Sequence, residues 1–113
     1  MPYIAINTSK TLSDTQKDEI KALLGERITL IPGKEESRLM VDISDGRSMY
    51  FAGERRELAF VDVRCYGTTE FAHKKVFTEA AFEALNRAAG LPGDSIYLSY
   101  SEFDTWGTLG SMK

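Results

Sequence analysis

The chain is organised around its first six residues, Met1-Pro2-Tyr3-Ile4-Ala5-Ile6. Its β-branched and apolar residues predict a strand over residues 3–8 that runs from the chain end into the body of the protein. If Met1 is removed, Pro2 becomes a terminal secondary amine. An α-amino group has a pKa near ~8, and apolar surroundings lower that pKa by disfavouring the cation. Pro2 is therefore a candidate acid–base group near neutral pH. The alternative is that Met-Pro is only a common way for a protein to begin.

Length and composition are typical of one globular domain over residues 1–113. No apolar run reaches the ~18 residues of a membrane span, and we expect neither a membrane partner nor a signal peptide. A net charge of −3 argues against nucleic acid as a partner. One cysteine and one histidine exclude an internal disulfide and a usual zinc site, so we expect no metal.

The first half of the chain reads as strand, helix and strand. Residues 13–16 are Ser-Asp-Thr-Gln, a capping box that predicts the start of a helix. Apolar residues at helical spacing then predict this helix over 14–30, closed by Pro32-Gly33. Alternation over 39–43 predicts the second strand, and 48–52 forms a shorter strand-like run.

The second half has the same order. A third main strand is predicted over 58–65, followed by a helix that opens at 68–70 and ends near Ala89. Gly90 supplies the C-terminal stop of that helix, and the fourth main strand covers 96–100.

The two halves, about 2–57 and 58–113, therefore look like a duplicated βαβ unit. We expect an α+β (α/β) fold in which a four-stranded mixed sheet carries both helices on one face. The other sheet face must be solvated or covered by another subunit, which favours an oligomer.

These features together resemble the tautomerase superfamily, and within it the macrophage migration inhibitory factor (MIF) branch. The resemblance rests on Met-Pro opening a strand, on the duplicated unit, on Pro32-Gly33-Lys34 before the second strand and on Asp94-Ser95-Ile96-Tyr97 opening the fourth. It covers essentially the whole chain. It implies a homotrimer whose three sheets form a barrel, with active sites at the subunit boundaries.

The resemblance also implies residue roles. Pro2 is the catalytic base once Met1 is lost, and Lys34 holds a substrate carboxylate or enolate. Backbone near Tyr66 donates an N–H group to substrate, and Tyr97 reaches in from a neighbouring subunit. The typical reaction is keto–enol tautomerisation of an aryl pyruvate such as phenylpyruvate. A neutral amine moves the proton and a cation stabilises the oxyanion, so no cofactor is expected.

Several positions depart from the pattern of that branch or fit it loosely. Ser99 replaces a pocket asparagine, and Arg38 and Arg64 make the mouth of the pocket more cationic. Cys65, at the end of the third strand, is a further candidate for substrate binding. The alternative is that its side chain is unreactive and only packs against its neighbours. Trp106 fits a pocket wall, a subunit interface or the core.

Three functions remain open from the sequence. The first is a tautomerase that acts on a small α-keto or enol acid. The second is a MIF-like effector that binds a protein receptor and keeps a vestigial pocket. The third is another proline-dependent reaction of the superfamily, such as a decarboxylation or hydration. We expect a cytoplasmic protein, or one secreted without a signal peptide.

Overall fold

The computed structural model describes residues 1–113 and contains two helices and eight strands. Its elements, in chain order, are β1 (Pro2–Thr8), α1 (Asp14–Arg27), β2 (Met40–Ser44), β3 (Tyr50–Phe51), β4 (Glu54–Arg55), β5 (Ala59–Tyr66), α2 (Phe71–Ala89), β6 (Ile96–Phe103), β7 (Gly107–Thr108) and β8 (Ser111–Met112). Short 3₁₀ turns cover Ile28–Leu30, Glu36–Arg38 and Gly93–Ser95.

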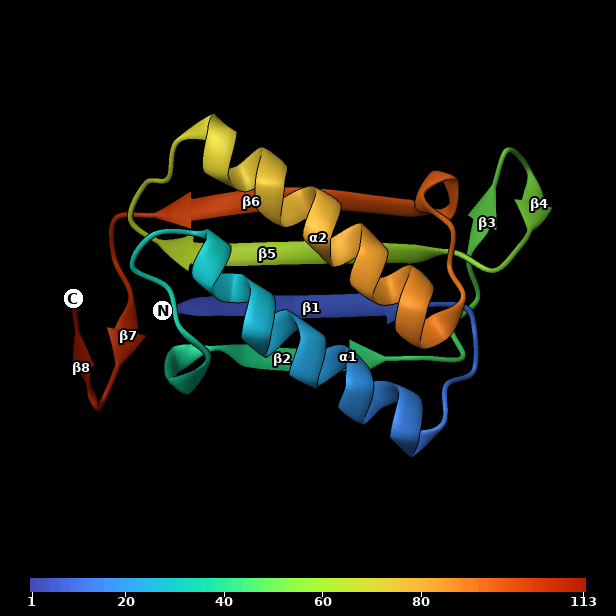
Figure 1. The fold of residues 1–113 in the computed structure, drawn as a ribbon, viewed down its shortest axis with the longest axis horizontal. Coiled ribbons are helices and arrows are strands. Elements are labelled where there is room, and N and C mark those ends of the chain that lie inside the picture. Colours follow the sequence, from blue (N-terminus) through green and yellow to red (C-terminus); the bar gives the residue numbers. More distant parts are fainter.

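The main sheet has the strand order β2-β1-β5-β6. The two outer pairs, β1 with β2 and β5 with β6, are parallel, and the central pair of β1 and β5 is antiparallel. Both helices lie across the same face of this sheet (Figure 1). The predicted four-stranded mixed sheet, with two repeated βαβ halves and both helices on one face, is confirmed.

The first helix begins at its capping box. The Ser13 side chain accepts from the Gln16 backbone N–H, and the Gln16 side chain accepts from the Ser13 N–H, which satisfies two exposed donors. Regular α-helix ends at Arg27, and a 3₁₀ turn continues to Leu30, so the predicted end at residue 30 includes this tighter turn. Gly25 is buried, and the side chain of Glu36 occupies the space that a Cβ atom would need there, so a larger residue would displace Glu36.

The second helix begins at Phe71, later than the predicted 68–70, and ends as predicted. Gly90 adopts the left-handed conformation at φ 69°, and its N–H bonds back to the carbonyls of Leu85 and Asn86. Such a cap favours glycine, which has no Cβ to clash in this conformation.

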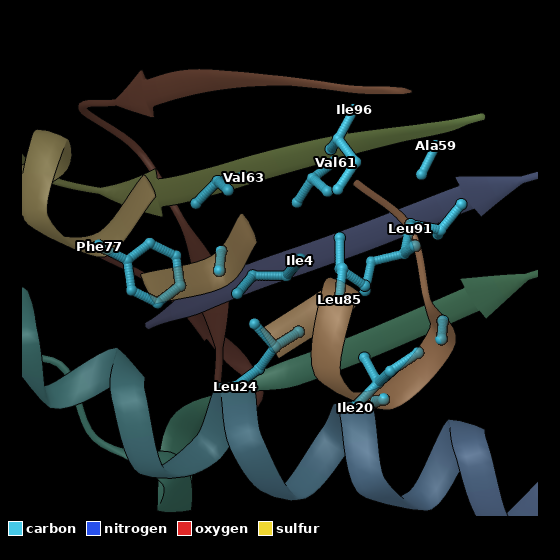
Figure 2. Packing of buried hydrophobic residues seen from close by; sticks show 14 of the residues in the cluster. Ile4, Ile20, Leu24, Ala59, Val61, Val63, Phe77, Leu85, Leu91 and Ile96 are labelled. Atoms are coloured by element: carbon cyan, nitrogen blue, oxygen red, sulfur yellow. The ribbon is translucent and has the colours of Figure 1, made fainter. Parts of the chain in front are cut away.

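The core lies between the helices and the sheet (Figure 2). Alternate residues of β1 and β5 point into it, and Phe77 of α2 is among its fully buried side chains. Burial of apolar area is the main driving force for this packing. No helix is long and apolar enough to cross a membrane.

The opposite face of the sheet is open and carries both polar side chains and exposed apolar ones such as Met40 and Phe60. Tyr3 donates its hydroxyl to Asp42 at 2.7 Å, and Arg64 donates to Asp62 at 3.0 and 3.2 Å. These side chains come from three neighbouring strands and form a polar layer that no part of the chain covers. The predicted run 48–52 becomes one arm of the small β3–β4 hairpin, and the tail forms a second hairpin, β7–β8.

Candidate active site

The chain end is held at one edge of the sheet, where β1 begins and β5 ends. Pro2 is buried and pairs with Cys65 in the antiparallel ladder. The Tyr66 N–H donates to the carbonyl oxygen of Met1 at 3.4 Å. In this structure the terminal amine is that of Met1, so the Pro2 nitrogen is a peptide amide with no basic lone pair.

A hollow of about 860 Å³ opens over this chain end, and we call it the N-terminal pocket. Fourteen residues line it, among them Met1, Pro2, Tyr3, Arg38, Arg64 and Trp106. They come from β1, β5, the 3₁₀ turn before β2 and the C-terminal segment, so segments far apart in the sequence meet here. Its mixed apolar and cationic lining fits a small organic anion.

Lys34 lies at the same end of the sheet. Its Nζ donates to the Tyr66 carbonyl oxygen at 2.8 Å, and its backbone N–H closes a turn onto the carbonyl of Ile31. An ammonium group carries three N–H donors, so the bond to Tyr66 leaves two of them for another acceptor.

The environment of the pocket favours a neutral amine. Burial lowers the pKa of the terminal amine from its ordinary value of 8.0, and Lys34 and Arg38 lower it further by charge repulsion. Cys65 and Glu35 raise this pKa, but the net direction is downward. An amine that sheds its proton more readily than usual is a better general base near neutral pH.

The predicted pocket arginines lie on the rim. Arg38 is exposed and 3.9 Å from Glu35, a long and solvated ion pair. Arg64 lies over the ring of Tyr3 at 5.6 Å and is held by Asp62, and that carboxylate raises the pKa of the guanidinium. Arg38 is therefore the less constrained of the two cations.

Trp106 and Cys65 take different places. Trp106 lines the pocket and packs against Phe103 with 6.0 Å between ring centres. The Cys65 side chain points into the core and is only 3% exposed. Burial raises the pKa of its thiol, which makes it an unreactive group beneath the site.

Tyr97 and Ser99 do not line the N-terminal pocket of their own chain. Tyr97 begins β6 at the opposite end of the sheet, where its ring meets Phe51 edge-on at 5.8 Å. It is 61% exposed, and Ser99 lies on the same open face, beside Asp62 in the register. The chain therefore places Pro2 and Lys34 at one end of the sheet and Tyr97 at the other. Lys34 and Tyr66 lie beside the chain end but are not among the residues that line the N-terminal pocket.

Sequence reasoning missed several lining residues. Tyr3, Met40 and Phe103 all line the pocket from the open face of the sheet, and Leu109 reaches it from the tail. The alternation of β1 places Tyr3 on the face opposite Ile4, which was a usable signal. The tail carried no comparable pattern, because its hairpin is only two residues wide on each side.

Comparisons with known proteins agree with this geometry. The profile of the family described as "Macrophage migration inhibitory factor (MIF)" matches residues 1–112. The fold is similar to that of MIF2 from Leishmania major, with a TM-score of 0.93 and 26% identity over 100% of this chain and 97% of that one. No curated protein matches the sequence.

Two more distant structures share the fold alone. One is Pt0534 inactivated by 2-oxo-3-pentynoate, with a TM-score of 0.87 and 14% identity over 96% of this chain and 93% of that one. The other is a fused 4-OT described as a symmetric trimer, with a TM-score of 0.86 and 13% identity over the same shares of the two chains. The family match over nearly the whole sequence, together with the fold and the buried proline at its chain end, shows that this chain belongs to the MIF family.

Proposed function

We propose that this protein is a keto–enol tautomerase for a small α-keto or enol acid, and that the Pro2 amine is its acid–base group once Met1 is removed. One observation carries the proposal. The chain end is buried beside Lys34, and both burial and that cation lower the pKa of the terminal amine. A neutral secondary amine at this place can take a proton from carbon.

Removal of Met1 also changes the hydrogen bonding of the pocket. The Tyr66 N–H now donates to the Met1 carbonyl, and this acceptor leaves with Met1. The N–H group is then free beside the Lys34 ammonium, and both can face the oxygen of a substrate carbonyl. Donors that are fixed in advance at a developing oxyanion are a large source of catalysis.

The proposed reaction needs two proton transfers. The Pro2 nitrogen takes the proton α to the substrate carbonyl, and the electron pair moves onto the carbonyl oxygen as an enolate. Lys34 and the Tyr66 N–H stabilise that oxyanion, and Arg38 holds the substrate carboxylate at the rim. The protonated Pro2 then returns the proton to the oxygen, which completes the ketone-to-enol conversion, and the reverse steps return the ketone.

We further propose a homotrimer in which Tyr97 and Ser99 complete a neighbouring subunit's pocket. Support comes from the open sheet face, which exposes Met40 and Phe60, and from the exposure of Tyr97 far from its own chain's Pro2. The fused 4-OT with this fold is a symmetric trimer. A solution mass three times the 12.6 kDa of one chain, measured by light scattering, is the expected result.

A second candidate function is that of a MIF-like effector that binds a protein receptor and keeps a vestigial pocket. One contact favours it, because Asp62 already occupies the Arg64 guanidinium and reduces its capacity to hold a carboxylate. The two functions differ in what they require of Pro2, since receptor binding needs no basic amine.

The test is an absorbance assay of phenylpyruvate tautomerisation on protein whose loss of Met1 has been verified by intact mass. A 2-keto acid without an aryl group serves as the second substrate. We expect Pro2→Gly, which keeps a terminal amine but loses the ring, to reduce kcat/KM by about 100-fold. Turnover of neither substrate by Met1-free protein would overturn the tautomerase proposal and leave the effector function.

A further inference from the structure

We propose that this chain has a second binding site, at the other end of its sheet, for a ligand that carries phosphate or sulfate groups. The site is a hollow of about 530 Å³ with an entirely polar lining, and we call it the basic hollow. Its charged residues are the cations Lys10, Arg47, Arg55 and Arg56 and the single acid Glu57. This site is independent of the proposed tautomerase function.

The basic hollow and the N-terminal pocket lie at opposite ends of β1. Lys10 follows the end of β1, whereas Pro2 begins it, and seven residues of strand span roughly 20 Å. The β3–β4 hairpin, which carries Arg55, lies far from the chain's N-terminus (Figure 1). The two hollows share no lining residue.

The charge of the basic hollow is opposite to that of the protein. The whole chain carries a net charge of −3, yet four cations and one carboxylate meet here. Arg27, Arg38 and Arg64 each form an ion pair elsewhere in the fold, but none of the three arginines of the hollow does. Lys10 lies 4.0 Å from Glu57, whose side chain is 66% exposed, so this pairing is weak.

Aromatic rings of the hairpin hold two of the guanidinium groups. Arg55 lies over the Tyr50 ring at 5.0 Å and donates to the Tyr50 hydroxyl at 2.6 Å. Arg56 lies over the Phe51 ring at 5.1 Å. A cation–π contact orients a guanidinium without neutralising its charge, so both groups keep donors for an anion.

Hydrogen bonds also lock the loops that form the hollow. The Ser9 hydroxyl donates to the Arg56 carbonyl at 2.6 Å and accepts from the Leu58 N–H at 2.9 Å. The Arg47 N–H donates to the Thr8 carbonyl at 3.1 Å. Three segments distant in sequence are therefore fixed against one another, which lowers the entropy lost when a ligand binds.

The chemistry of the lining selects an oxyanion. Planar guanidinium groups donate in pairs to phosphate and sulfate oxygens and are less strongly hydrated than ammonium groups. None of the seven residues that line the hollow is hydrophobic, so apolar contacts come only from the aliphatic parts of polar side chains. The ligand class is therefore a small molecule with several phosphate or sulfate groups.

Calorimetric titration tests this inference with two probes, inorganic tripolyphosphate and a sulfated disaccharide, at one fixed ionic strength. The test variant is Arg55→Gln with Arg56→Gln. The matched control is Lys21→Gln with Lys75→Gln, which removes two charges from exposed helix positions that form no ion pair. Thermal melting verifies that both variants remain folded.

We expect saturable binding of at least one probe, weakened about tenfold in the arginine variant and within about twofold of wild type in the control. The probe that binds more tightly identifies phosphate or sulfate as the preferred group. Absence of saturable binding of both probes would overturn the proposal. Equal weakening in the two variants would also overturn it, because it would reveal only general attraction to positive charge.

Discussion

Lys34 and Tyr66, 32 residues apart in sequence, are joined by a hydrogen bond from the lysine Nζ to the tyrosine carbonyl oxygen at 2.8 Å. This bond fixes a mobile, long side chain against the end of β5, next to the buried chain end. The ammonium group therefore stands at a set position before any substrate arrives, and two of its three donors remain free.

Replacement of Lys34 tests that position directly. We expect Lys34→Met to reduce kcat/KM by about 100-fold, from the loss of ~3 kcal/mol of charge-assisted contact with the oxyanion. Lys34→Arg keeps the charge and should lose less. Steady-state kinetics with melting curves of both variants provide the measurement. Equal kcat/KM in wild type and Lys34→Met would remove Lys34 from the proposed mechanism.

The expected pH dependence of kcat/KM follows from the lowered pKa of the terminal amine. Burial is the largest cause of this shift and Lys34 the second. Once Met1 is lost, Pro2 occupies this environment and must be neutral to act. We expect kcat/KM to fall on the acid side with a midpoint below the ~8 of an ordinary α-amine.

Two further results follow from that lowered pKa. The Lys34→Met change should move the acid limb of the pH–rate profile to higher pH, because the repelling charge is gone. The unfolding free energy should rise with pH between the folded and unfolded pKa values of the amine, since the unfolded chain binds more protons there. If the acid limb of the pH–rate profile stays at the same pH in Lys34→Met, the charge of Lys34 does not lower the pKa of the amine.

Glu102 gives a second, independent pH effect. Its carboxylate accepts from Lys74 at 2.7 Å and from the Thr69 N–H at 2.6 Å, and these contacts lower its pKa, Lys74 foremost. A depressed carboxyl pKa contributes stability above its unfolded value, and this contribution is lost as the pH falls through the folded value.

We therefore expect Glu102→Gln to lower the unfolding free energy at pH 7 by about 1 kcal/mol, with a smaller difference at an acid pH below the lowered pKa of Glu102, where both side chains are uncharged. Urea unfolding at the two pH values measures this difference. Glu79→Gln, at an exposed position of α2, the helix that carries Lys74, is the control and should change stability little. If the difference in unfolding free energy between wild type and Glu102→Gln is the same at acid pH, the charge of Glu102 does not cause that difference.

The hydrogen bond between Thr69 and Glu102 also illustrates a limit of prediction from the sequence. Residues 68–70 are predicted as the start of a helix, yet Glu70 is an extended N-cap and α2 begins at Phe71, while the Thr69 N–H before it donates to Glu102, 33 residues away. No local pattern reports a partner so distant. Ser13 and Gly90, by contrast, set their helix ends through local bonds, and both were predictable.

The residues of the candidate site also divide into those that the sequence could indicate and those that it could not. The predicted strands 3–8 and 58–65 each stop one residue short of Pro2 and Tyr66, which the structure includes in β1 and β5, and the family resemblance supplied the roles of Tyr66 and Lys34. The sequence could not indicate that Phe103 and Leu109 would line the pocket with Pro2, because the tail returns to the pocket through tertiary packing of a very short hairpin. Nor could it separate the buried Cys65 from the residues that line the pocket.

Mixed oligomers test whether Tyr97 acts across a subunit boundary. Pro2→Gly and Tyr97→Ala should each be poorly active alone. In the proposed homotrimer, a pocket is intact when Pro2 comes from one variant and Tyr97 from the other, so refolding an equal mixture should restore about a quarter of the wild-type activity.

A second mixture gives the matched control for that experiment. Pro2 and Lys34 lie at the same end of one chain, so mixing Pro2→Gly with Lys34→Met creates no intact pocket and should restore nothing. Native mass spectrometry verifies that subunits have exchanged in both mixtures. Recovery in neither mixture, despite exchange, would contradict the action of Tyr97 across a subunit boundary, whereas equal recovery in both would contradict the assignment of Pro2 and Lys34 to one pocket.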